Sequence, residues 1–310
     1  MSSFVKVSNW LLYLDCYNLC LSAITFKKKW IVFTPLQIHP ALFSIKTVTG
    51  VALANASLDI ALHDKILIAS SIGLISEPEH IKPFWVGLMD GDGSIQVNHW
   101  REQSLQYRLI IKLSNLKSNY NMLIEIAKVL GGTVKITGKG AEVIWVVNKK
   151  QEVEKIIKIY EIYPPLTSKK ICQLAFLKTC LTETSVETYL SNRNLKYDKQ
   201  LTIINSNINF KIPTYFKNWL SGFIEAEGCF SIRKSNNHSF SIGQNDDKYI
   251  LDKIKNHFNI TNQVKKKGDR FWVIEIYRKS ILINIVNHCI EYPLLGEKIL
   301  SFTKFRDLFK

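Results

Sequence analysis

A ten-residue pattern occurs twice in this chain, and it constrains the fold more than any other feature. Residues 85–94 read WVGLMDGDGS, and residues 220–229 read LSGFIEAEGC. Each copy is an apolar helical stretch that ends in an acid, a small residue, a second acid and a glycine. Two such helix ends in one fold can meet and place carboxylates around a shared divalent metal. The duplication therefore predicts two similar halves with a joint site at the seam between them.

The repeat covers a whole domain as well as the helix. After each acidic tip, alternating polar and apolar residues predict hairpins, and helical spacing predicts the helices. In the first half we expect strands at 94–97, 107–114, 133–137 and 142–147, with helices at 121–130 and 152–162. In the second half we expect strands at 229–233, 239–244, 262–266 and 270–277, with helices at 248–258 and 281–290. A Tyr-Pro element then leads to a lysine in both halves, Lys169 and Lys298.

These elements define an α+β chain of two pseudo-symmetric αββαββα repeats, whose antiparallel strands form a saddle. We assign the first repeat to residues 81–181 and the second to residues 214–310. Residues 182–213, rich in Asn, Ser and Thr, form the predicted linker. Residues 1–80 are a nearly neutral hydrophobic leader, in which charges interrupt each apolar run before it reaches the roughly 18 residues of a membrane span. A partial hydrophobic helix over residues 41–62 is left open.

The charge of the chain restricts its partners. Its 310 residues carry a formal net charge of +15, and nearly all of the excess lies beyond the leader. Such a surface attracts polyanions, so nucleic acid is the leading partner class and an acidic membrane surface the second. The six cysteines form no CxxC pair, which predicts reduced cysteines and no structural zinc. A GxxxxGKS phosphate loop and a His-Asn-His spacing are also missing from the sequence, which excludes nucleotide-driven enzymes and that nuclease class.

The paired motifs and matched lysines resemble the two-repeat LAGLIDADG homing endonucleases over about residues 82–310. The resemblance implies that the motif helices pack side by side, which fits Gly87 and Gly222, because absent side chains let two backbones approach closely. It also implies a metal-dependent DNA endonuclease that hydrolyses phosphodiester bonds, with Mg²⁺ as the cofactor and Mn²⁺ able to substitute.

The resemblance further implies roles for individual residues. Asp92 and Glu227, the second acids of the two motifs, are the expected metal ligands. Lys169 and Lys298 match the family's catalytic lysines, where an ammonium organises water or stabilises phosphate charge; phosphate docking or plain solvation is their alternative role. The other motif residues are expected to support the helix ends, namely Gly87, Asp90, Gly93, Gly222, Glu225 and Gly228.

A polar strand residue completes the expected catalytic set. Gln244 matches the residue that holds water beside the metals in the family. Its counterpart in the first repeat is expected to be Ser114. Because serine is shorter than glutamine, we expect the two half-sites to differ in efficiency.

The hairpins of both repeats are expected to lie over double-stranded DNA, with alternate residues reaching the major groove. Arg and Gln can read base edges, whereas Lys mostly contacts phosphates. The turn over residues 265–270 is the strongest single candidate for phosphate binding, and a solvated strand face is the alternative for each residue alone. The candidates are Gln96, Asn98, Arg101, Arg108, Lys112, Lys135, Lys139, Arg233, Lys234, Lys265, Lys267 and Arg270.

The leader carries a second resemblance, because residues 47–64 are similar to a segment of cytochrome c oxidase subunit I. This implies an open reading frame within a mitochondrial intron, continuous with the upstream exon, and a leader that is removed or dispensable. We therefore expect a monomer with internal pseudo-twofold symmetry in the mitochondrion, cutting both strands of the intronless gene and so promoting intron homing. Two alternatives stay open: an RNA maturase that helps its own intron RNA to splice, and an integral membrane fragment.

Overall fold

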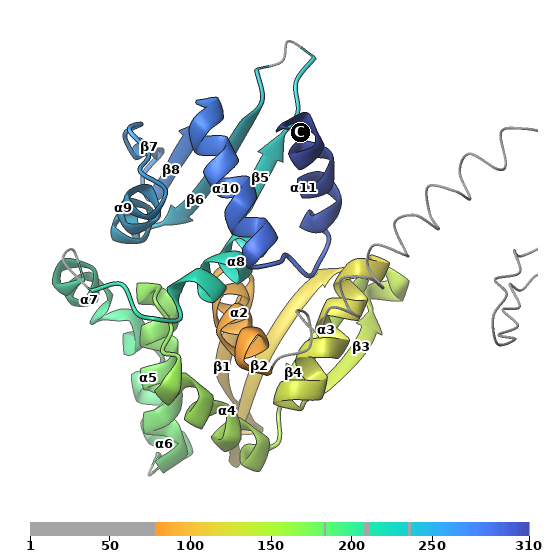
Figure 1. Ribbon diagram of the computed structural model, residues 1–310. Coiled ribbons are helices and arrows are strands. Elements are labelled where there is room, and N and C mark those ends of the chain that lie inside the picture. Colours follow the sequence, from red (N-terminus) through yellow and green to blue (C-terminus); the bar gives the residue numbers. More distant parts are fainter. Residues whose placement is uncertain (1–77, 183, 208–210, 235–236, 310) are drawn as a thin grey trace, which may run out of the picture. The chain divides into compact units, whose positions relative to one another are not determined.

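The computed structural model describes residues 78–309 except 183, 208–210 and 235–236 (Figure 1). The oxidase-like segment and nearly all of the predicted leader lie outside these residues. Within the described part, no helix combines the length and the apolar character that crossing a membrane requires.

Two repeats follow each other along the chain, and each contains a four-stranded antiparallel sheet. The strand orders are β1-β2-β4-β3 and β5-β6-β8-β7, so the two sheets have the same topology. This confirms the predicted α+β class with pseudo-symmetric repeats. The elements of the first repeat are α2 (Pro78–Gly91), β1 (Gly93–Trp100), β2 (Ser104–Ser114), α3 (Lys117–Leu130), β3 (Thr133–Thr137), β4 (Glu142–Val147), α4 (Lys150–Ile162) and α5 (Ser168–Thr182). Those of the second are α8 (Phe216–Glu227), β5 (Gly228–Ser231), β6 (Ser239–Asn245), α9 (Lys248–His257), β7 (Lys265–Lys267), β8 (Phe271–Ile276), α10 (Lys279–Glu291) and α11 (Lys298–Arg306).

Each repeat has one helix more than the predicted αββαββα order, because α5 and α11 follow the Tyr-Pro elements. The buried face of α5 mixes polar and apolar residues, among them Ser168, Lys170, Gln173 and Leu174. A hydrophobic stripe of helical period is therefore hidden, and the sequence pattern did not reveal the helix.

The first hairpin is longer than predicted. The ladder between β1 and β2 extends to the pair Trp100 and Ser104, so three residues connect two strands that were predicted to end at 97 and to begin at 107. Arg101 and Glu102 have positive φ values of 47° and 57° in that turn. The polar strand residues before it resemble turn residues in the sequence, because one face of the strand is open to solvent.

Short helices occupy much of the predicted linker, namely α6 (Val186–Asn192), the 3₁₀ helix η2 (Arg193–Tyr197) and α7 (Gln200–Ser206). Ser185 caps α6 by accepting a hydrogen bond from the Thr188 amide at 3.1 Å. The buried Tyr189 donates its hydroxyl hydrogen bond to the Val97 carbonyl of β1 at 2.8 Å. These contacts dock the segment on the first repeat.

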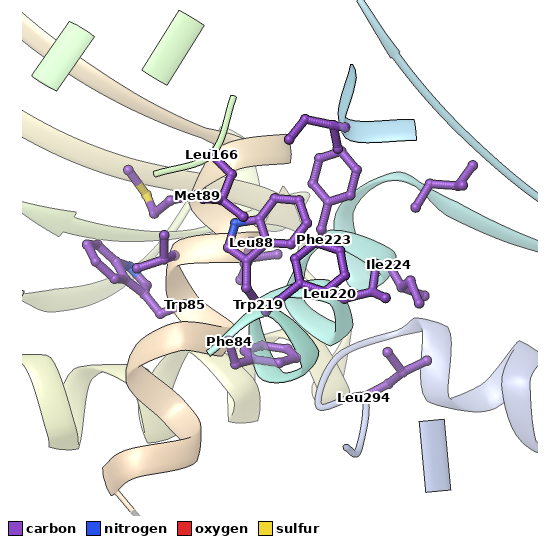
Figure 2. Packing of buried hydrophobic residues seen from close by; sticks show 14 of the residues in the cluster. Phe84, Trp85, Leu88, Met89, Leu166, Trp219, Leu220, Phe223, Ile224 and Leu294 are labelled. Carbon is purple, nitrogen blue, oxygen red and sulfur yellow. The ribbon is translucent and has the colours of Figure 1, made fainter. Parts of the chain in front are cut away.

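The motif helices α2 and α8 pack against each other through glycine (Figure 1). A Cβ atom on Gly87 would overlap the carbonyl oxygen of Trp219, and one on Gly222 would overlap that of Phe84. Figure 2 shows the large side chains that surround this contact, including Phe84 and Leu88 from α2 and Trp219 and Phe223 from α8. The contact at these glycines agrees with the close backbone approach that the resemblance implies.

Candidate functional site

The two acidic tips converge because both motif helices end at the same place. Helix α2 ends at Gly91 and α8 ends at Glu227. A Cβ atom on Gly91 would overlap the Ala226 side chain and would lie 3.4 Å from Oε1 of Glu227. Burial raises the pKa of Glu227, and the nearby negative charge of Asp92 raises it further. The carboxylates that end the two motifs therefore share one electrostatic environment.

The first acids of the motifs are buried and fully engaged. Asp90 is 2% exposed and accepts hydrogen bonds from the Leu166 amide at 2.8 Å, the Thr167 hydroxyl at 2.6 Å and the Trp219 indole at 2.7 Å. Glu225, 5% exposed, accepts from the backbone amides of residues 296 and 298, each at 3.0 Å. Each acid thus fixes the loop that leads to the lysine of its own repeat.

Two lysines face the acid pair, and one of them was missed by the sequence. Lys298 donates to the Ala226 carbonyl at 3.1 Å. On the other side, Lys169 is exposed, whereas the next residue, Lys170, is only 4% exposed. Desolvation raises the pKa of Asp92, and the positive charges of Lys298 and Lys170 oppose that rise. The Asp92 residue itself remains exposed to solvent.

Lys170 is a desolvated cation. Burial lowers its pKa to about 8, against the opposing effect of the Asp90 carboxylate. Positions 170, 174 and 177 of α5 are all buried and share one helical face. This helical spacing of buried residues is the sequence signal that distinguishes Lys170 from Lys169. Both lysines line the same cavity as Glu227.

The lysine-bearing helices are capped across the repeat boundary. The Ser168 amide at the start of α5 donates to the Asp247 carboxylate of the second repeat at 2.9 Å. Next to α11, the Glu297 amide donates to the Asn119 side chain of the first repeat, also at 2.9 Å. Side-chain acceptors at helix starts satisfy amides that have no partner within the helix. Each repeat therefore positions the lysine helix of the other.

Two cavities lie beside the acidic tips, and each is lined by residues from both repeats. The first has a volume of about 270 Å³, and its lining includes Lys169, Lys170, Glu227, Gln244 and Asp247. The second has a volume of about 620 Å³, and its lining includes Asp92, Leu113, Ser114, Glu225 and Lys298. Of the predicted catalytic residues, the first cavity holds Lys169, Glu227 and Gln244, and the second holds Asp92 and Lys298.

The predicted counterpart of Gln244 is wrong by one residue. Gly93 pairs with Ile111 in the first sheet, and Gly228 pairs with Ile242 in the second. Counting from these pairs, Gln244 corresponds to Leu113, and Ser114 corresponds to Asn245. A shift of one residue along a strand exchanges the two faces of the sheet, so Ser114 lies on the face opposite to that of Leu113.

The open face of the first sheet gathers several of the predicted DNA-contacting residues. Gln96 pairs with Arg108, and Lys112 pairs with Ile144, which in turn pairs with Lys135. Paired residues point to the same face of a sheet. The opposite face is buried. Asn98 shares the open face, whereas Arg101 lies in the hairpin turn with its guanidinium carbon 5.2 Å from the Trp100 ring centre.

The remaining predicted contacts lie in the second sheet and in turns. Lys265 and Lys267 belong to β7, Lys139 lies in the 3₁₀ turn between β3 and β4, and Arg233 and Lys234 follow β5. Several of the basic side chains already have acidic partners. Lys112 pairs with Glu142 at 2.7 Å and Lys267 with Glu275 at 3.0 Å.

Arg270, in the expected phosphate-binding turn, holds Asp246 through its guanidinium, with Nε 2.8 Å from Oδ1. These pairs make the basic surface less uniform than the sequence suggests.

Comparison with known proteins supports the fold and identifies the family. The profile of the family described as LAGLIDADG endonuclease matches residues 85–180 and 220–309. The chain belongs to the LAGLIDADG endonuclease family.

Two curated relatives are both named "Probable intron-encoded endonuclease aI3". The one from Debaryomyces hansenii is 43% identical over 335 aligned positions, gaps included, and the match covers 85% of this chain and 49% of the relative. The one from Dictyostelium citrinum is 48% identical over 237 residues, which span 75% of this chain and 97% of the relative. This chain therefore matches about half of the first relative and nearly all of the second.

Among solved structures, the I-LtrWI LAGLIDADG homing endonuclease bound to target DNA has a TM-score of 0.58 with this chain at 20% identity. The similarity covers 75% of this chain and 90% of that one. At this identity the comparison supports the fold alone.

Proposed function

We propose that this protein is a site-specific endonuclease that cuts both strands of double-stranded DNA. The observation that carries the proposal is the meeting of Asp92 and Glu227, from opposite repeats, beside the ammonium groups of Lys170 and Lys298. Phosphodiester hydrolysis requires a positioned water, charge neutralisation at phosphate and a stabilised leaving oxygen. The two carboxylates and the two ammonium groups, close together, are side chains that can perform these tasks.

The donor set fits a divalent metal such as Mg²⁺, with Mn²⁺ as a substitute. Among the described residues, neither Asp92 nor Glu227 accepts a hydrogen bond, so both carboxylates have oxygens available. In the same part of the chain, no group of three or more His, Cys, Asp or Glu side chains is arranged to hold a metal. Mg²⁺ usually keeps several waters and uses one or two carboxylates together with substrate phosphates, which suits a pair. When bound, the cation would supply Lewis acidity toward water and phosphate.

The protein's own groups would do the positioning. Lys298 is held by its contact with the Ala226 carbonyl and places its ammonium next to the acidic tips. Gln244, in the first cavity, offers an amide that can both donate to and accept from a water molecule. The open sheet faces, with residues such as Arg108 and Lys135, would orient the duplex over the cavities.

The gene context forms part of the same proposal. The names of the relatives support an intron-encoded endonuclease. The oxidase-like stretch at residues 47–64 supports placing that intron in the mitochondrial gene of cytochrome c oxidase subunit I. It would act in the mitochondrion as a monomer with internal pseudo-twofold symmetry. Cutting the intronless gene would let repair copy the intron into it.

The test incubates the full-length protein with Mg²⁺ and a duplex that spans the exon junction of the intronless gene. We expect a specific double-strand cut that is lost in Asp92→Asn and in Glu227→Gln. The matched control is Glu125→Gln, which removes an exposed carboxylate of α3 that is paired with Lys128. No cut by the unaltered protein, or cutting that survives both tip substitutions, would contradict the proposal. Faster splicing of the precursor RNA without DNA cutting would instead indicate the maturase.

A further inference from the structure

The two cavities occupy equivalent places in the repeats but differ in chemistry. Besides Lys170 and Gln244, the smaller cavity is lined by Asp247. The larger one includes apolar side chains from several elements, among them Met122 and Phe230. We name the first the Gln half-site, defined by Lys170, Glu227, Gln244 and Asp247, and the second the Leu half-site, defined by Asp92, Leu113 and Lys298.

Strand register establishes the first unequal pair. Gln244 and Leu113 occupy the same position of the two sheets, because both lie two residues beyond the partner of the motif glycine. Each side chain lines its own cavity. Glutamine can donate to and accept from water, whereas leucine can do neither.

The helix that follows each sheet establishes a second pair. Asp247 is the N-cap residue of α9, and Leu116 is the N-cap residue of α3. Asp247 is 1% exposed, and among the described residues its Oδ1 atom has no hydrogen-bond partner. A buried carboxylate oxygen without a partner at a cavity wall is a strong acceptor for water. Leu116 is 40% exposed and has no polar side-chain atom.

The lysine helices give a third pair. The cross-repeat caps act on the Ser168 and Glu297 amides, which makes these two residues equivalent. Lys169 therefore corresponds to Lys298, and Lys170 corresponds to Ile299. At these equivalent positions the smaller cavity is lined by both Lys169 and Lys170, whereas the larger cavity is lined by Lys298 and not by Ile299. A second lysine of the larger cavity, Lys304, lies further along α11.

These differences all favour the same half-site. Water that attacks phosphate must be held in line, and positioned polar groups each lower the barrier. Together with the function proposed above, on which this step rests, the geometry leads us to propose that the two strands are cut in a fixed order. The strand over the Gln half-site is cut first, and cutting over the Leu half-site limits the formation of the double-strand break.

The expected kinetics follow from the loss of positioned polar groups. Removing one such group commonly slows an enzymatic step on the order of 100-fold. We therefore expect strand rates that differ by at least about 10-fold, since the Leu half-site retains Lys298 and the shared acids. A supercoiled target plasmid should pass through a nicked circle before it becomes linear.

The experiment labels each strand of the target duplex separately and follows both cuts with the full-length protein and Mg²⁺. Gln244→Leu should slow cutting of the fast strand, and Leu113→Gln should accelerate cutting of the slow strand. Each substitution alone should therefore bring the ratio of the two cutting rates closer to one. Leu201→Gln, on the exposed face of α7, is the matched control and should leave the ratio unchanged. Duplex binding in metal-free buffer, measured by fluorescence anisotropy, should remain within about twofold for all variants.

Equal strand rates in the unaltered protein, without a nicked intermediate, would overturn this inference while leaving the endonuclease function intact. A strand ratio that does not change in Gln244→Leu would also overturn it, even if Leu113→Gln fails to fold. Absence of any cut would overturn the proposed function together with the strand order.

Discussion

At the scale of single residues, the position of a side chain on its element decides its role. Lys169 and Lys170 are neighbours in the sequence, but only Lys170 is buried on the helix face directed at the acids. The motif spacing favoured Lys169. Spacing along the chain cannot show which of two adjacent side chains points inward, because a helix turns by about 100° per residue. The same reason explains the one-residue error at Ser114, where strand alternation decides the face.

Replacing Lys170 by methionine should lower the cleavage rate more than the same replacement of Lys169. The buried ammonium opposes the negative charge at the tips, and its loss removes positive charge from the place where phosphate is attacked. We expect a decrease on the order of 100-fold for Lys170→Met and less than about 10-fold for Lys169→Met. Single-turnover cleavage measures both, with thermal unfolding to verify the fold. Equal decreases would contradict this assignment.

His288 should make the protein sensitive to acid. It is 6% exposed beside the Ser221 hydroxyl, and burial lowers its pKa from 6.5 to about 3. Between these values the unfolded chain binds more protons than the folded one, so stability falls as the pH falls from 6.5 toward 3. Urea unfolding at several pH values should show that His288→Gln loses on the order of 4 kcal/mol less over this window. Identical pH dependence in both proteins would contradict the prediction.

At the scale of elements, hairpins were the easiest parts to predict. Strands 133–137 and 142–147 match β3 and β4, because alternation and the glycine turn gave consistent signals. Helix α5 was missed because its buried face includes polar residues such as Lys170 and Gln173. Helix α11 was missed because it is short and its buried residues are just Phe302 and Phe305, too few to show a helical period. The cross-repeat caps from Asn119 and Asp247 were equally hidden, since they join residues far apart in the sequence.

The seam between α2 and α8 should tolerate no side chain at its centre. Gly222→Ala places a methyl group on the Phe84 carbonyl, which neither backbone can avoid without separating the helices. We expect a loss of several kcal/mol in the free energy of unfolding and slower cutting of both strands, because the tips move apart. Chemical denaturation and strand-resolved cleavage measure the two effects. A loss below about 0.5 kcal/mol would show that the seam is looser than the structure indicates.

At the scale of the whole molecule, duplication was the feature that the sequence predicted best. Repeated motifs predicted two pseudo-symmetric repeats and the meeting of their acidic tips. The sequence did not reveal that each cavity combines residues of both repeats, because a motif shows what belongs to a repeat and not what the other repeat contributes. Lys169 and Gln244 are an example, because they belong to different repeats and yet line one cavity.

The central claim is that Asp92 and Glu227 work as one shared site. Its most direct test is strand-resolved cutting by Glu227→Gln, with Glu125→Gln as the control. If the tips form one site, losing a single carboxylate should slow both strands on the order of 100-fold or more, and adding Asp92→Asn should slow them little further. Loss of one strand only, with the other still cut at its normal rate, would show that the two acids act separately and would contradict the account.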